Sequence, residues 1–153
     1  MPQAGGASRV GRPLSRCCPN LFPGWFASRG WSPRPHQLAL LDAARERRST
    51  LLIAPTGAGK TLAGFLPSLV SLAQRARPNR GQRLHTLYIS PLKALAVDVA
   101  RNLMTPIAEM ELPIRTETRS GDTSAARRTR QRQAPPDILM TTPEQLALLL
   151  SHQ

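Results

Sequence analysis

A short segment between Pro55 and Thr61 combines glycines, a lysine and a threonine at a spacing that suits phosphate binding. Gly57 and Gly59 allow backbone conformations that a side chain forbids, so successive N–H groups can turn inward around phosphate oxygens. Lys60 would neutralise charge on the outer phosphates, which makes it the candidate catalytic residue, and the Thr61 hydroxyl would ligate Mg²⁺. The predicted nucleotide-binding residues of this segment are Thr56, Gly57, Ala58, Gly59, Lys60 and Thr61.

The segments on either side of this loop must hold it in place. Residues 51–54 are apolar and predict a short buried strand, while the apolar stretch after Lys60 is long enough for a helix. A helix that starts there adds partial positive charge where the phosphates would lie. Ala54 replaces the glycine that begins the strict pattern. A glycine-rich turn with a chance Lys-Thr pair is the alternative, and the order strand, loop, helix favours the phosphate loop.

Beyond the loop, strands and helices are predicted to alternate. Apolar runs at residues 84–90 and 137–142 predict buried strands, and a shorter strand is expected to end at Gly121. A helix with one apolar face is predicted after Pro91, the face being formed by Leu95, Val99, Leu103 and Ile107. Such alternation argues for an α/β fold with a mainly parallel sheet and right-handed crossovers.

Prolines and small polar residues mark the expected helix ends. Pro106 should kink or end the helix after Pro91. Asp122 or Thr123 is expected to cap an arginine-rich helix, and Pro143 fits the first turn of the last helix. The arginine-rich helix spreads its charges around its circumference, which favours a solvated face over a binding stripe; these residues are Arg127, Arg128, Arg130 and Arg132.

The chain is strongly basic, with 21 lysines and arginines against 9 acids among 153 residues and a net charge of +12. Such a balance suggests a polyanionic partner such as nucleic acid, although a genome that favours arginine codons is an equal explanation. The hydrophobic fraction of 41% supports one packed domain. We expect this domain over residues 24–153, after a disordered leader at residues 1–23.

The leader and the cysteines bear on the compartment. Residues 1–23 contain several arginines and no acid, so an organellar transit peptide is the alternative to a disordered leader or an overextended start codon. Cys17 and Cys18 are adjacent, and the sequence contains no further cysteines with which they could form a disulfide framework or a metal site. This fits a reducing compartment. No apolar run reaches membrane-spanning length. We therefore expect a cytoplasmic, bacterial protein.

Five segments occur in an order that resembles the first motor domain of a superfamily 2 helicase. They are "PRPHQ" (33–37), "APTGAGKT" (54–61), "SPLKAL" (90–95), "RSGDT" (119–123) and "TTPEQL" (141–146). Together with "GWSPRPHQ", these motif sequences are similar to those of the Lhr-type, ligase-associated DEXH group of DEAD/DEAH-box helicases, which act on DNA. The resemblance covers residues 26–153. It implies a RecA-like P-loop NTPase fold that binds ATP and Mg²⁺.

The resemblance also implies roles for further residues. Gln37 would pair with the N6 and N7 edge of adenine, since its amide carries a donor and an acceptor. Single-stranded or partly duplex DNA would be contacted through its phosphates, without sequence preference, by Pro91, Lys93, Gly121, Thr142 and Pro143. Phe26 and Trp31 are assigned to core packing rather than adenine stacking. The three histidines, His36, His85 and His152, are assigned no chemistry.

Hydrolysis by such a motor needs an acidic pair at the end of a buried strand and an arginine from a second RecA-like domain. None of the acids beyond Thr61 follows an aliphatic strand. We therefore expect an incomplete RecA-like domain, truncated before the DEXH motif and lacking the second domain, that is inactive alone. The alternatives are a non-catalytic module that binds nucleotide and nucleic acid and, less favoured, another P-loop enzyme such as a kinase.

Overall fold

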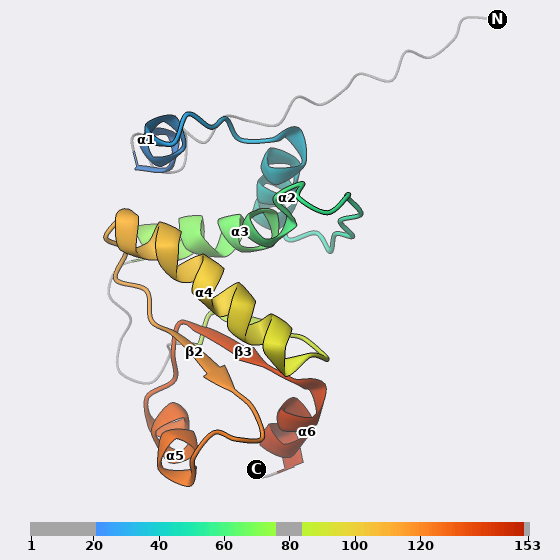
Figure 1. The fold of residues 1–153 in the computed structure, drawn as a ribbon, viewed down its shortest axis with the longest axis vertical. Helices are drawn as coiled ribbons and strands as arrows, with labels where there is room; N and C mark the ends of the chain where they lie inside the picture. Colours follow the sequence, from blue (N-terminus) through green and yellow to red (C-terminus); the bar gives the residue numbers. More distant parts are fainter. Residues whose placement is uncertain (1–20, 76–83, 152–153) are drawn as a thin grey trace, which may run out of the picture. The chain divides into compact units, whose positions relative to one another are not determined.

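The computed structural model describes residues 21–75 and 84–151. Their elements, in chain order, are α1 (Leu21–Ser28), α2 (Pro35–Arg45), α3 (Lys60–Gln74), β1 (Thr86–Ile89), α4 (Lys93–Glu109), β2 (Thr116–Arg119), α5 (Ala125–Gln133), β3 (Ile138–Thr141) and α6 (Pro143–Ser151) (Figure 1). The chain divides into two compact units, Met1–Pro67 and Ser68–Gln153, and the boundary falls within α3.

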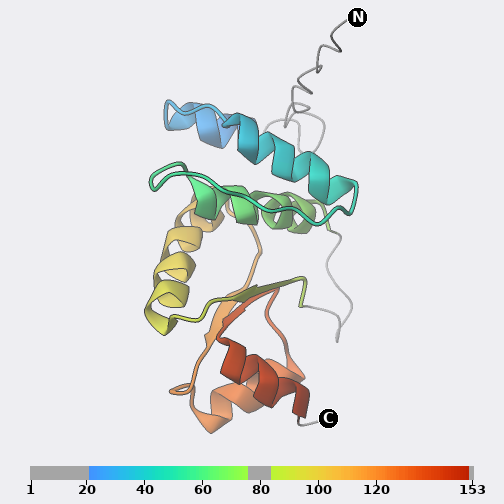
Figure 2. The same cartoon turned by 90° about the vertical axis from the view of Figure 1, so that its right-hand side faces the viewer.

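The first unit is built around α1 and α2. Phe22, Trp25 and Phe26 are the buried residues of α1, and the rings of Trp25 and Phe26 meet edge to face with centroids 5.2 Å apart. Pro35 lies in the first turn of α2, where its missing N–H costs no helical hydrogen bond. Residues 46–59 then run back along α2 to the start of α3 (Figure 2). This path returns the chain to the first turn of α2.

The second unit contains a parallel sheet in the order β1-β3-β2. The central strand β3 is buried along its whole length, as its sequence Ile-Leu-Met-Thr suits. Successive residues of β2 face opposite sides of the sheet: Thr116 donates to the sulfur of Met104 in α4 at 3.3 Å, whereas Glu117 meets α5. Helix α4 therefore covers one face, and α5 and α6 lie on the other (Figure 1). The predicted α/β fold with a parallel sheet is confirmed.

Two predicted buried strands differ from the structure. Residues 51–54 have no regular structure and are not part of the sheet that the described residues form, and Leu51 and Ile53 are 83% and 85% exposed. Residues 84–90 do contain β1, but its alternate residues Leu87 and Ile89 are exposed. The prediction of burial was wrong at both places. An apolar run indicates that a segment is stabilised by burial, but it does not supply the neighbouring strand that would bury it.

Helix α4 runs through the proline that was expected to kink or end it. Pro106 lies in the last turn and is buried, and the helix continues to Glu109. A proline so close to the end costs few helical hydrogen bonds, and its burial offsets that loss. The predicted apolar face is confirmed at three of its four positions, but Leu95 is exposed and Ala96 is buried instead.

The cap of α5 is also shifted from its predicted position. Ser124 occupies the N-cap, and its hydroxyl accepts a hydrogen bond from the backbone N–H of Arg127. Thr123 serves the preceding turn instead, because its hydroxyl accepts from the N–H of Ser120 at 2.9 Å. Pro143 begins α6 as predicted.

Most of the predicted leader lies outside the described residues, as do Cys17, Cys18 and His152. Within the described part, the last residues of the predicted leader belong to α1, where Phe22 is 1% exposed. None of the helices in residues 21–75 and 84–151 has the length and apolarity that a membrane span requires.

Candidate nucleotide site and strand-end surface

The phosphate loop adopts the backbone shape that its glycines allow. Gly57 and Gly59 have φ angles of +79° and +72°, in the left-handed region that side chains disfavour. A tight turn is closed by the N–H of Ala58, which donates to the carbonyl of Pro55 at 3.2 Å. Helix α3 then begins at Lys60, directly after the turn. The local sequence thus places free N–H groups of a helix start beside a concave loop, as phosphate binding requires.

Lys60 folds back onto the loop from the first position of α3. Its ammonium group donates to the carbonyl oxygens of Ala54 and Pro55 at 2.8 and 2.7 Å. The predicted cation therefore lies against the loop, where a phosphate would meet it. Thr61, the predicted Mg²⁺ ligand, is exposed at the next position, and so is Thr56. Within residues 21–75 and 84–151, no group of three or more His, Cys, Asp or Glu side chains could hold a metal ion.

The first turn of α2 contacts the phosphate loop through two consecutive side chains. Nε2 of His36 lies 3.0 Å from the carbonyl oxygen of Ala58. Gln37 is buried, its Oε1 accepts from the N–H of Arg34 at 2.9 Å, and its Nε2 lies 3.1 Å from where a Cβ on Gly59 would stand. No chemistry was predicted for His36, and its observed role is structural: its ring binds a carbonyl of the loop.

These elements line a partly open cavity of about 520 Å³, a size typical of small-molecule sites. Its lining residues are Phe26, Gly30, Trp31, Ser32, Arg34, Gln37, Gly57, Gly59 and Leu62. Phe26 is buried as predicted, whereas Trp31 is half-exposed at 51%, so the assignment of Trp31 to the core was wrong. Its ring packs edge to face on Trp25 at 6.0 Å, and the Arg29 guanidinium lies 5.1 Å from it. The cavity joins the loop to an aromatic surface and an amide, which suits a nucleotide.

The predicted DNA-contacting residues lie at one end of the sheet in the second unit. Register pairs Ile89, Thr141 and Arg119, so the three parallel strands end side by side. Two further hydrogen bonds tie these ends together, from the Ser90 N–H to the Thr141 carbonyl and from the Thr141 hydroxyl to the Arg119 carbonyl, both at 3.0 Å. The predicted residues follow directly: Pro91 and Lys93 after β1, Gly121 after β2, and Thr142 and Pro143 after β3. Ligands of open α/β sheets bind beyond such ends.

Two acids lie against these predicted contacts. Lys93 forms an ion pair with Asp122. A hydrogen bond from the Thr142 hydroxyl, together with one from its own backbone N–H, lowers the pKa of the exposed Glu144 carboxyl. Both predicted phosphate-contacting groups therefore have a carboxylate partner within the chain.

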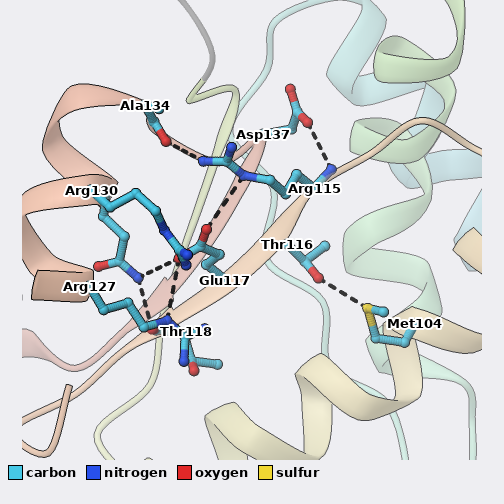
Figure 3. Close-up of polar contacts among 10 residues, drawn as sticks. Met104, Arg115, Thr116, Glu117, Thr118, Arg127, Arg130, Ala134 and Asp137 are labelled. Atoms are coloured by element: carbon cyan, nitrogen blue, oxygen red, sulfur yellow. Dashed lines mark hydrogen bonds and ion pairs between the residues drawn. The ribbon is translucent and has the colours of Figure 1, made fainter. Parts of the chain in front are cut away.

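Glu117 of β2 anchors α5 to the sheet (Figure 3). Its side chain is 8% exposed, and its Oε2 accepts from Nε2 of buried Gln131 at 2.9 Å. Three guanidinium groups lie 3.4–3.5 Å from its oxygens, those of Arg115, Arg127 and Arg130. Burial raises the pKa of this carboxyl, but the Gln131 hydrogen bond and the three charges outweigh it and hold the pKa below its ordinary value.

The arginines of α5 are mostly exposed, which agrees with the predicted solvated face, but three of them also have partners within the chain. Arg127 and Arg130 pair with Glu117, and Arg128 donates to the carbonyl of Gly121 at 2.6 Å. Arg132 is exposed. Helical spacing describes the helix alone, and it does not reveal a carboxylate on a neighbouring strand.

Comparisons with known proteins agree with this arrangement. A family model described as DEAD/DEAH box helicase matches residues 34–153. The chain is 48% identical over 138 residues to the Lhr helicase/probable uracil glycosylase of Mycolicibacterium smegmatis, covering 83% of this chain and 9% of that protein. It is 40% identical over 144 residues to the Lhr helicase/uracil glycosylase of Escherichia coli, again covering 83% and 9%. With the ATP-dependent helicase Lhr-Core of Methanocaldococcus jannaschii, identity is 36% over 138 residues, and the shares are 83% and 16%.

Solved structures give the same result. The M. smegmatis helicase Lhr bound to ssDNA and AMP-PNP superposes with a TM-score of 0.78 at 44% identity, over 91% of this chain and 18% of that chain. The DUF1998 helicase MrfA bound to DNA and AMPPNP gives 0.77 at 33% identity, over 92% and 19%. The yeast DEAD-box splicing factor Prp28, at 19% identity and a TM-score of 0.68, shares the fold. The chain thus spans a small part of the length of the relatives it matches.

Proposed function

Because the chain belongs to the DEAD/DEAH box helicase family, we propose that it is the ATP-binding part of an ATP-dependent DNA helicase or translocase of the Lhr type. The observation that carries the proposal is the cavity that joins the phosphate loop to the first turn of α2. The positive φ angles of Gly57 and Gly59 and the position of Lys60 at the start of α3 fit a bound triphosphate.

Each residue of the site has a distinct role in this proposal. Lys60 exchanges its bonds to the loop carbonyls for bonds to the outer phosphates, and the loop N–H groups hold the phosphates in place. The Thr61 hydroxyl would hold Mg²⁺, which would supply charge neutralisation at the phosphates. Gln37 reads the adenine edge. Hydrolysis also requires an acidic pair and an arginine from a second RecA-like domain, and the proposal assigns neither role to a residue of this chain.

DNA is the proposed partner of the strand ends. The single strand would cross Pro91, Lys93, Gly121, Thr142 and Pro143, and contacts to its phosphates would let the motor move without reading sequence. The two ssDNA- or DNA-bound structures above support this, as does the net charge of +12. We also propose a bacterial cytoplasmic location. The support for it is the bacterial origin of two relatives and the absence of spaced cysteines in the sequence.

Gln37 provides a test of base recognition that is separate from phosphate binding. Gln37→Glu keeps an oxygen that can accept from the Arg34 N–H, and glutamate suits this position of a helix start, so α2 should remain folded. The variant keeps an acceptor for the N6 amino group of adenine but loses the amide donor to N7, which both purines present. It should therefore weaken the binding of ATP and of GTP by about 10-fold, for one hydrogen bond, and retain the preference for ATP. Competition of ATP and of GTP with a fluorescent nucleotide measures both affinities.

The control for this test is Gln74→Glu, which makes the same change at an exposed position at the end of α3. It should leave the affinities for both nucleotides unchanged. Affinities that are the same in the parent and in Gln37→Glu would show that Gln37 serves only to cap α2.

Binding to single-stranded DNA should depend steeply on salt. With two or three phosphate contacts, raising salt from about 50 mM to about 200 mM should weaken binding by about 5- to 20-fold, because bound phosphates release counterions. Fluorescence anisotropy with a labelled oligodeoxythymidine measures the affinity, and a mixed-sequence strand of equal length should bind equally well. An affinity independent of salt would contradict a phosphate-based interface.

A further inference from the structure

An ion pair links two of the segments proposed to contact DNA. Lys93 is the first residue of α4, and Asp122 lies in the turn between β2 and α5. Their side chains are 54% and 74% exposed, so the pair lies on the surface where a DNA strand would approach. The cation proposed to meet a phosphate is therefore already paired with a carboxylate of the same chain.

Hydrogen bonds before and after Asp122 hold the turn that contains it. The Ser120 N–H donates to the Thr123 hydroxyl at 2.9 Å, and the Thr123 N–H donates to the Ser120 carbonyl at 3.1 Å. Arg128 also donates to the carbonyl of the residue before Asp122 at 2.6 Å. A surface ion pair usually loses stability to the entropy of two free side chains. Here the turn holds one partner in position, which lowers that cost.

The start of α4 has an excess of positive charge without this carboxylate. Leu92 occupies the N-cap and has no side-chain oxygen that could accept a hydrogen bond, and the first turn contains no acid. Lys93 adds its charge to the positive end of the helix dipole, an arrangement that favours a nearby anion. Asp122 supplies that negative charge in the absence of DNA.

A second residue proposed to contact DNA, Thr142, also has a carboxylate beside it. The Thr142 hydroxyl, which follows β3, lies beside the Glu144 carboxylate and helps to lower its pKa. An acid from the chain itself thus engages each of the two side chains that offer a hydrogen-bond donor to a phosphate.

We propose that Asp122 competes with the DNA backbone for Lys93, so that a phosphate must displace the carboxylate in order to bind. The inference rests on the proposed function of the strand ends. Asp122 then acts as a positioning residue that shortens the lifetime of the contact between Lys93 and a phosphate. A motor that must release its strand at every step requires such short-lived contacts.

The test compares two substitutions that remove the same charge. Asp122→Asn frees Lys93 and should tighten binding of a labelled oligodeoxythymidine by about 3- to 5-fold at low salt, the range expected for one surface ion pair. Asp98→Asn, at an exposed position further along α4, removes an equal charge away from the pair and should change affinity by less than about 2-fold. The effect of Lys93→Ala should also be larger in the Asp122→Asn background than in the parent chain.

The outcomes separate this inference from the proposed function. Salt-dependent binding by the parent chain, with equal effects of the two asparagine variants, would overturn the competition and leave the DNA-binding role intact. Absence of binding by the parent and both variants at low salt would overturn both. Because Lys60 and Lys93 are the only lysines in the chain, NMR of the side-chain ammonium groups gives a readout without DNA. The Lys93 signal should move in Asp122→Asn and not in Asp98→Asn; no movement in either would overturn the inference.

Discussion

Replacing Lys60 by alanine is expected to weaken ATP binding by about 10- to 100-fold, the equivalent of losing one or two charge-assisted hydrogen bonds. Lys60 is placed for this role at the first position of α3, with its ammonium group against the carbonyls of Ala54 and Pro55. The outer phosphates would lose their charge partner in the variant. Titration calorimetry with a non-hydrolysable ATP analogue measures the change.

The matched control is Arg48→Ala, which removes one positive charge from an exposed position in the same unit. It should leave nucleotide affinity within about 2-fold of the parent, since exposed charges are screened by solvent and salt. Circular dichroism of both variants tests that the helices are retained. Equal affinity of the parent and Lys60→Ala for the analogue would refute the phosphate loop assignment.

Replacing Glu117 by alanine is expected to destabilise the second unit by about 2 to 4 kcal/mol, as removal of one partner from a buried charge cluster does. The buried amide of Gln131 would lose its acceptor, and three guanidinium groups would face one another without a carboxylate. The arginines are partly exposed, so water restores some of the loss. Urea denaturation measures the free energy of unfolding.

The contribution of Glu117 should disappear in acid. Its pKa in the folded chain lies below the ordinary value of 4.5, so the folded state favours the charged form. The stabilisation is therefore fully present above the unfolded-state pKa and is lost as the pH falls through the folded-state pKa. The stability difference between the parent and Glu117→Ala should be constant near neutral pH and shrink below about pH 4.5.

Glu46→Ala is the control for Glu117. Glu46 also has an ion-pair partner, Arg48 at 2.7 Å, but both side chains are more than half exposed. Its loss should cost less than about 1 kcal/mol. Similar costs at the two positions would mean that the Glu117 cluster does not hold α5 on the sheet.

Segments whose own residues determine their environment were predicted well. The strand around Ile138–Thr141 and the helix that begins at Pro143 form where they were predicted, because a continuous apolar run and a proline at a helix start act locally. Residues 51–54 behaved differently, since a strand exists only with a partner. The same limit applies to the exposed face of β1.

In the candidate site, too, features set by local sequence were predictable, whereas contacts between distant residues were not. Glycines with positive φ and a lysine at a helix start form a local pattern, so the loop shape was predictable from "APTGAGKT". The contact of His36 with Ala58 and the cluster around Glu117 join residues distant in the sequence. Their spacing along the chain carries no trace of these contacts. The exposure of Trp31 likewise depends on how α1 and the following loop pack.

The strand order of the sheet governs when it can form during synthesis. β1 and β2 do not pair with each other; both pair with β3, which is the last of the three to be made. A ribosome would therefore expose two strands with unsatisfied backbone groups before Ile138–Thr141 emerges between them. Thr86 must then find Ile138 across a long intervening chain, a slow closure typical of parallel sheets. Until that moment the nascent chain depends on its helices for compactness.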